Sequence, residues 1–354
     1  MKKRVKSLNE KEIKIIKGID LIKRVKNEPR PSFIWGDIPK GSIGLITGVA
    51  KTGKTTFAEN LAMSLSIGRK QFFGKQLSGV PKKVLFVNLE ESYRIRSWRN
   101  EKQISTFTEK ELELFIENYI STPIDFPEFL LEDKHWEYLR NYILKSKADI
   151  IFIDSLTHMF ANGSIEKSLD ANKFVQKLNY YLVSLNKTFV IIHHNVKGNE
   201  KPIEQDNIAG SRVVLQKFHY AYGFANIPKG GSYTCMLNNK FVQCDSSKAT
   251  LYEINENNWV TNVSTTNKFN LYKDSYVADG RIDSTNQDLI YNYFQSQTSK
   301  DSQGILTGEL QDHFVISDTM SKDTLFKCLK KLINDDKIIK IKNGVYQLNE
   351  EIDG

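Results

Sequence analysis

Nine consecutive residues near the start of the chain have the types and spacing of a phosphate-binding loop. The first eight match the pattern G-x-x-x-x-G-K-[ST], and a second threonine follows. The nine residues are Gly48, Val49, Ala50, Lys51, Thr52, Gly53, Lys54, Thr55 and Thr56. In such a loop backbone N–H groups cradle phosphates, the lysine reaches the β- and γ-phosphates, and the threonine hydroxyl binds Mg²⁺. The residues therefore predict a site for ATP, or another nucleoside triphosphate, with Lys54 on the phosphates and Thr55 on Mg²⁺. A surface turn rich in Gly, Lys and Thr is the alternative.

The residues around this loop supply the strand and the helix that it needs. Residues 43–47 form an apolar run, and residues 57–67 are rich in helix-forming residues. A turn between a strand and a helix places the positive N-terminal end of the helix at the phosphates.

Two further apolar runs end in carboxylates. Residues 84–89 lead into Glu90 and Glu91, and residues 148–153 lead into Asp154. Because parallel strands end at one edge of a sheet, we expect these acids beside the phosphate loop. One of the two glutamates would polarise the water that attacks the γ-phosphate, and Asp154 would hold Mg²⁺ opposite the threonine. Acidic residues that only solvate a strand end are the alternative for the glutamates.

A fourth apolar run, residues 188–192, ends in two histidines, and apolar runs alternate with helical patterns throughout this part of the chain. This alternation predicts an α/β fold with a mostly parallel sheet covered by helices. The segments GVAKTGKTT, LFVNLEES, IIFIDS, IIHHN and IAGSR occur in this order over residues 35–255. Together they resemble the RecA-like P-loop ATPases, and within them the hexameric RepA-type helicases and their relatives of the DnaB and RadA kinds.

The resemblance implies roles for individual residues. Glu90 matches the catalytic glutamate, Asp154 the magnesium aspartate, and one of His193 and His194, with His194 preferred, a sensor of the γ-phosphate. RepA-type relatives carry Arg-Gly-Ser where this chain has Ala-Gly-Ser followed by Arg212. Arg212 is therefore the candidate for an arginine finger that enters a neighbouring subunit's site, with a structural salt bridge as the alternative.

The resemblance also implies partners. It predicts a homo-oligomer, a hexameric ring, that hydrolyses ATP between subunits and holds single-stranded DNA in its channel. Residues 196–206, with Lys197 and Lys201, and residues 158–165 are the two candidate channel loops, although two lysines are equally ordinary surface charge.

The composition and charge of the chain set its expected class. It has 354 residues, 40% of them hydrophobic, a net charge of +8 and three cysteines without metal-ligand spacing. The basic balance fits a polyanionic partner. No run is long enough to cross a membrane and the charged N-terminus does not resemble a signal peptide, so we expect a soluble, cytoplasmic protein. Residues 1–34 read as a basic arm, which is either a solvated leader or a segment that packs on a neighbouring subunit.

The ATPase domain is expected over residues 35–273, a linker over 274–286 and a small domain over 287–350. The small domain shows three helical patterns and two strands in the outline of a winged helix. Its apolar positions are Leu289, Ile290, Tyr293, Phe294, Leu325, Leu329, Leu332 and Ile333. The strands 338–341 and 345–348 meet at Asn343-Gly344, a pair that favours a type I′ turn.

The third helix and the wing of this domain carry lysines that suit duplex DNA, although winged helices also dock proteins. They are Lys322, Lys327, Lys330, Lys331, Lys340 and Lys342.

Three functions fit these observations. The first is an ATP-dependent DNA motor, a replicative helicase of the RepA type from a plasmid or phage. The second is a recombinase or loader ATPase of the RecA or RadA kind, which assembles on DNA without unwinding it. The third is a DNA-binding regulator that responds to ATP, which would not need a full set of hydrolytic residues.

Overall fold

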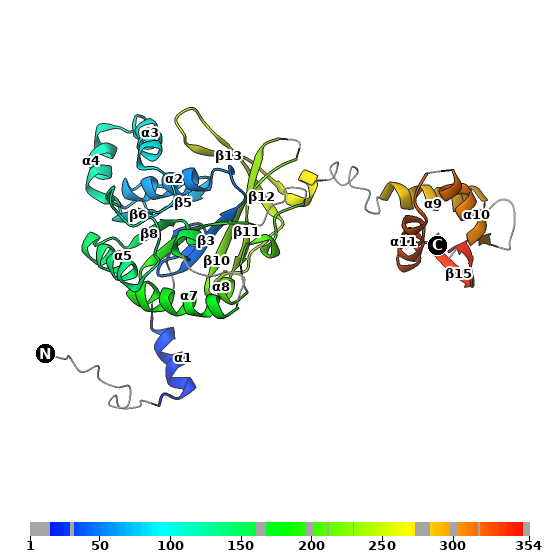
Figure 1. The fold of residues 1–354 in the computed structure, drawn as a ribbon, viewed down its shortest axis with the longest axis horizontal. Coiled ribbons are helices and arrows are strands. Elements are labelled where there is room, and N and C mark those ends of the chain that lie inside the picture. Colours follow the sequence, from blue (N-terminus) through cyan, green and yellow to red (C-terminus); the bar gives the residue numbers. More distant parts are fainter. Residues whose placement is uncertain are drawn as a thin grey trace.

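A nine-stranded sheet forms the centre of the structure between residues 33 and 272 (Figure 1). The computed structural model describes residues 15–28, 32–160, 168–195, 201–210, 212–228, 230–272, 284–297, 304–317 and 319–349. The strand order is β13-β12-β11-β10-β3-β9-β8-β6-β7. Strands β10 to β7 pair in parallel, and β10 to β13 pair antiparallel.

The strands of this sheet are β3 (Ile43–Gly48), β6 (Val84–Asn88), β7 (Tyr119–Ser121), β8 (Ile150–Asp154), β9 (Thr188–His194), β10 (Tyr220–Asn226), β11 (Ser232–Asn239), β12 (Lys248–Ile254) and β13 (Val260–Asn267). Two small hairpins stand apart from it: β1 (Phe33–Trp35) with β2 (Ile38–Pro39), and β4 (Gln71–Phe72) with β5 (Lys75–Gln76).

Helices cover both faces of the sheet (Figure 1). They are α2 (Lys54–Ser66), α3 (Tyr93–Ile104) and α4 (Glu109–Asn118) on one side, and α5 (Asp133–Ser146), α7 (Ser168–Tyr181) and α8 (Arg212–Lys217) on the other. Short helical segments are α6 (Leu156–Met159), η2 (Val183–Leu185), η3 (Gln205–Asn207) and η4 (Lys268–Tyr272).

Alternation along the central strands explains the two covered faces, because successive strand side chains point to opposite sides of a sheet. Phe86 and Phe152 pack with Phe57 of α2, whereas Leu85 and Ile151 belong to the core under α5 and α7. Strands buried on both faces read as continuous apolar runs, and this is why they were recognisable in the sequence. The α/β fold with a large, mostly parallel sheet agrees with the RecA-like core expected from the sequence.

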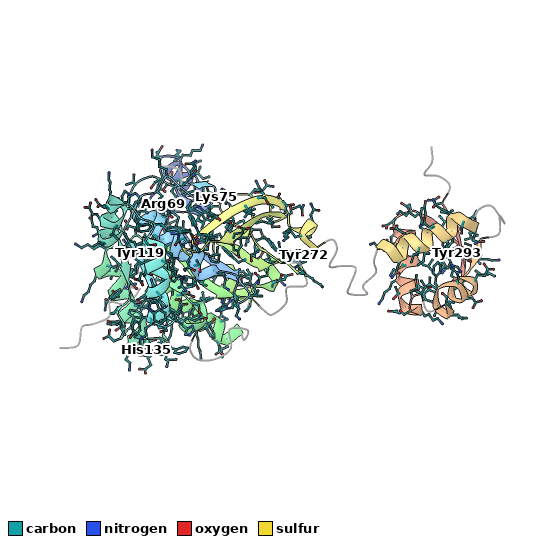
Figure 2. The ribbon with its side chains drawn as sticks, turned by 90° about the horizontal axis from the view of Figure 1, so that it is seen from above. Arg69, Lys75, Tyr119, His135, Tyr272 and Tyr293 are labelled. Carbon is teal, nitrogen blue, oxygen red and sulfur yellow. The ribbon has the colours of Figure 1, made fainter. Side chains whose placement is uncertain are left out.

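The described residues after Tyr272 form a second core of their own. Its elements are α9 (Ser284–Gln297), β14 (Ile305–Leu306), α10 (Thr307–Gln311), a π-helical turn η6 (Asp312–Ile316), α11 (Lys322–Asn334), β15 (Ile338–Lys342) and β16 (Val345–Leu348). The strand order is β14-β16-β15. Tyr293, labelled in Figure 2, stacks on His313 with ring centroids 4.3 Å apart.

Two details of this unit differ from expectation. Leu289 is 43% exposed, so the inner face of α9 is formed by Ile290 and Phe294 instead. A type I′ turn needs positive φ at both central residues. Gly344 has a φ of 77°, but the φ of Asn343 is not positive. The hairpin therefore does not use a type I′ turn. Of the expected inward positions of the third helix, Leu325, Leu329 and Leu332 are buried as predicted, and Ile333 is partly buried.

The N-terminal segment contains one helix, α1 (Gly18–Lys26). Ile19, Leu21, Ile22 and Val25 lie exposed, and no side chain of α1 is buried. Residues 161–167, which contain part of one predicted channel loop, and residues 196–200, with Lys197 of the other, lie outside the described residues.

Candidate functional site

The phosphate-loop residues connect β3 to α2, as the sequence predicts. Gly53 has a φ of 74° and precedes the first residue of α2, a left-handed conformation that favours glycine. At Gly48, a Cβ atom would lie 2.2 Å from the carbonyl oxygen of Phe224 in β10, so a larger residue cannot fit there. Both glycines of the pattern are therefore required by the backbone itself.

Hydrogen bonds within the loop fix its shape. The carbonyl of Val49 accepts from Lys54 Nζ at 2.7 Å and from Thr52 Oγ1 at 2.9 Å. The Tyr252 hydroxyl, from β12, donates to the carbonyl of Thr52. Burial lowers the pKa of Lys54 to about 8, although Asp154 and Glu90 act in the opposite direction. Lys54 is thus a largely desolvated cation next to the start of α2, suited to meet phosphate oxygens.

A hydroxyl and a carboxylate meet beside the loop. Thr55 Oγ1 donates to Asp154 Oδ2 at 2.7 Å, across the gap between α2 and the end of β8. Asp154 is 3% exposed, and this burial raises its pKa to about 6. A buried carboxylate beside a partly buried hydroxyl, next to the phosphate loop, fits Mg²⁺, which binds proteins through few carboxylates and through substrate phosphates. The two residues predicted to hold the metal are therefore brought together.

Glu90 lies at the same edge, beyond the end of β6. His194 Nε2 donates to Glu90 Oε2 at 3.2 Å, and His158 Nδ1 lies 3.8 Å from the same oxygen. The hydrogen bond from His194 lowers the pKa of Glu90 to about 2, assisted by a hydrogen bond with Ser155 and against the effect of burial. Glu90 is therefore a carboxylate at neutral pH and can orient a water molecule.

Glu91 occupies a different environment from Glu90. Its two carboxylate oxygens accept from Arg99 of α3, Oε1 from Nη1 at 2.8 Å and Oε2 from Nη2 at 2.5 Å. This two-point contact with a guanidinium fixes the direction of the Glu91 carboxylate, which faces Arg99 of α3. The geometry thus favours Glu90 over Glu91 as the residue that acts on water, which is the residue that the family resemblance implies.

The two histidines also differ. His193 is buried and its Nε2 donates to the carbonyl of Ala209 at 2.7 Å, whereas His194 is partly exposed and contacts Glu90. Burial lowers the pKa of His193 to about 4, so its ring is neutral at pH 7. Both histidines lie in β9 itself, not after it, and only His194 reaches the other predicted site residues.

Arg212 is the first residue of α8, and its side chain is not described, so the arginine-finger assignment remains a prediction. Lys201 is exposed.

A cleft of about 840 Å³ borders Glu90 and Glu91 on the side of α3, α4 and β7. None of the described phosphate-loop residues lines it. Phosphate binding depends on the N–H groups of the loop and of the α2 N-terminus, so the cleft is not the place for the triphosphate.

Two residues that support the site, Tyr252 and Arg99, are not part of any motif recognised in the sequence. Tyr252 comes from a strand about 200 residues after the loop that it supports, and no local pattern marks such a contact. Arg99, by contrast, left a signal: Arg96, Arg99 and Gln103 have the spacing of one helix face, and that face is polar.

Comparisons with known proteins bear on this site. Residues 15–200, more than half of the chain, match the AAA domain family AAA_25. No curated protein gives a significant sequence match. Among solved structures, a KaiC-like protein from the archaeon Pyrococcus horikoshii is 15% identical, with a TM-score of 0.47 over 64% of this chain and 91% of that one. In the described part of the chain, no helix has the length and apolar character needed to cross a membrane.

The buried, neutral His193 predicts a specific dependence of stability on pH. The unfolded chain binds a proton at His193 below about pH 6.5, whereas the folded chain does so only near pH 4. The free energy of unfolding should therefore fall as the pH falls from 7 to 5, by about 2 kcal/mol from this residue. The raised pKa of Asp154 has the opposite effect, because it makes the free energy of unfolding rise as the pH falls. A comparison of the wild type with a His193 variant removes this contribution, since both proteins contain Asp154.

Urea unfolding of the wild type and of His193→Asn at pH 7 and pH 5 measures this effect. Tryptophan fluorescence is the right signal because all four tryptophans lie in residues 35–259, the part of the chain that also contains His193. The variant should lose less stability than the wild type between the two pH values. Equal losses in the two proteins would contradict the assignment of a neutral buried ring.

Proposed function

From the premise that the chain belongs to this AAA domain family, we propose that it is a RecA-like P-loop ATPase that acts as an ATP-dependent, DNA-binding motor. In this proposal it resembles a replicative helicase of the RepA type from a plasmid or phage. It hydrolyses ATP at the interfaces of a homo-oligomeric ring, a hexamer, which encloses single-stranded DNA. The observation that carries the hydrolytic part is the convergence of Lys54, Thr55, Asp154, Glu90 and His194 at one sheet edge.

Each of these residues has a defined task in hydrolysis. Lys54 supplies a desolvated charge to the β- and γ-phosphates, and the loop N–H groups hold them in place. Thr55 and Asp154 hold Mg²⁺, which neutralises developing charge when bound. Glu90 orients the attacking water, and His194 connects Glu90 to the end of β9, whose following loop is a predicted DNA contact. Loss of the γ-phosphate would thereby be transmitted along β9.

Assembly into a ring is part of the proposal. Arginine fingers act from a neighbouring subunit in many P-loop enzymes, and Arg212 is the proposed finger here. The apolar side chains that α1 exposes support a role of the N-terminal arm in contacts between subunits.

A recombinase or loader ATPase of the RecA or RadA kind uses the same hydrolytic residues, and an ATP-responsive regulator uses only the binding residues. Strand separation on a forked DNA substrate distinguishes the three. A motor unwinds the fork with ATP, a loader hydrolyses ATP without unwinding, and a regulator does neither.

The central prediction separates nucleotide binding from turnover. Lys54→Ala should weaken ATP binding strongly, because the phosphates lose their point charge. Glu90→Gln should keep the affinity for ATP within about two-fold and lower kcat by at least about 100-fold, because the amide no longer orients water as a carboxylate does. Fluorescent-nucleotide binding and steady-state phosphate release measure the two quantities. Equal loss of binding in both variants would contradict the role of Glu90.

The small C-terminal unit is the proposed duplex-binding module, a winged helix. Its support is the order of three helices and a three-stranded sheet, together with lysines that lie exposed on α11 and β15. Among the described ion pairs, Lys327 is the lysine of this set that has a carboxylate partner: its Nζ lies 2.5 Å from Asp323 Oδ2. A docking role toward protein is the alternative for this unit.

Removal of two of these charges tests the module. The double variant Lys331→Gln with Lys342→Gln should weaken duplex binding and reduce the slope of log affinity against log salt by about one unit per lost phosphate contact. Basal ATPase activity should stay unchanged. The control is a variant of equal charge change on exposed positions of the ATPase part, Lys102→Gln with Lys110→Gln. An unchanged slope with reduced self-assembly would assign the module to protein docking.

A further inference from the structure

Helix α3 turns a charged face inward and an apolar face outward. Arg96 and Gln103 are buried, whereas Trp98, on the opposite face, is 65% exposed. A surface helix normally buries its apolar stripe, because burial of charge is costly. Polar partners must therefore compensate the inner face of α3.

The main partner is Glu59, one and a half turns after Lys54 on the phosphate-loop helix α2. Its side chain is completely buried. Arg99 binds it through two hydrogen bonds, Nε to Oε2 at 2.6 Å and Nη2 to Oε1 at 2.9 Å. Arg96 Nε lies 3.3 Å from Glu59, and Arg96 also donates to the hydroxyl of Tyr119, labelled in Figure 2, at 3.1 Å. A buried carboxylate is stable only with such pairing.

Arg99 has a second carboxylate partner, Glu91, which lies in the turn of residues 88–91 that carries Glu90. Its Nη1 and Nη2 groups bind both oxygens of Glu91, the residue next to Glu90. The backbone of Glu91 is held as well: its N–H donates to Asn88 Oδ1 at 3.2 Å, and its carbonyl accepts from Asn88 Nδ2 at 2.5 Å. One guanidinium thus connects the helix that follows the phosphate loop to the turn that carries Glu90.

We propose that Arg99 is a positioning residue for ATP hydrolysis. Arg99 binds Glu91 and Glu59 of α2 at once, and this contact, named here the Arg99 clamp, holds the neighbouring Glu90 in place. The inference rests on the proposed hydrolysis of ATP. His194 holds the Glu90 carboxylate from one side, and the Arg99 clamp holds the backbone of the turn from the other. In this proposal Glu91 acts as a tether and does not orient the attacking water. A planar, forked donor is needed for two carboxylates at once, and lysine does not provide one.

Two conservative variants test the clamp while preserving the fold. Glu91→Gln keeps the shape of the tether and weakens only its hold on Arg99. Arg99→Lys keeps a positive charge opposite the buried Glu59 but lacks the fork. Both should lower kcat by about ten-fold or more, because a displacement of about 1 Å at a reacting group costs up to about 100-fold. The affinity for Mg-ADP should stay within about two-fold of wild type, because no phosphate contact is lost.

The measurements are kcat and KM for ATP, the Kd for Mg-ADP, and the thermal midpoint of each full-length variant. Glu113→Gln, on the exposed surface of α4, is the matched control for loss of one carboxylate and should leave all of them unchanged. The double variant should be little worse than either single variant, since both break one connection.

The proposal is overturned if Glu91→Gln turns over ATP at the wild-type rate. It is also overturned if both variants lower the thermal midpoint and the ADP affinity together while kcat stays at the wild-type value, because the cluster would then serve packing alone. Failure of the proposed function is seen separately, in the wild type. A wild-type protein that hydrolyses no nucleoside triphosphate removes both proposals.

Discussion

The order of the parallel strands is the constraint on which the site depends. β9 lies between the phosphate-loop strand β3 and the Asp154 strand β8, and β6 follows β8. All four strands are parallel and end at one edge of the sheet. β6, β8 and β9 therefore bring Glu90, Asp154 and His194 to the phosphate loop, which follows β3. Glu90 reaches across the end of β8 to His194 because only one strand separates β6 from β9. Another order would separate Glu90 from the phosphates.

The contacts of each carboxylate at this edge of the sheet determine its role. Asp154 is buried against Thr55 and has a raised pKa, Glu90 faces His194 and has a lowered pKa, and Glu91 is bound by Arg99. Three neighbouring carboxylates therefore have three environments. Similar groups can take different roles when their surroundings separate their pKa values. The division between metal binding, water orientation and tethering follows from these contacts.

Much of this arrangement was predictable from the sequence, for a physical reason. Strands β3, β6, β8 and β9 are buried on both faces and so appear as apolar runs, and their ends carry the polar residues that the chemistry needs. The resemblance implied Glu90 and not Glu91, but the contacts that separate the two glutamates were not predictable, because they depend on Arg99 and its buried partner Glu59. The support of Thr52 by Tyr252 was equally hidden, since it joins residues 200 positions apart. The turn at Asn343 shows the opposite error, in which a local pattern suggested a conformation that the hairpin does not adopt.

A crystal structure with ADP, aluminium fluoride and Mg²⁺ tests the central claim most directly, because this mixture mimics the transferring phosphate. The account predicts phosphates on the backbone of residues 48–56, Mg²⁺ at the Thr55 hydroxyl with the Asp154 carboxylate beside it, and the attacking water hydrogen-bonded to Glu90. Glu91 should remain on Arg99. A water held by Glu91 with Glu90 turned away, or a nucleotide bound in the cleft between α3 and α4, would contradict the account.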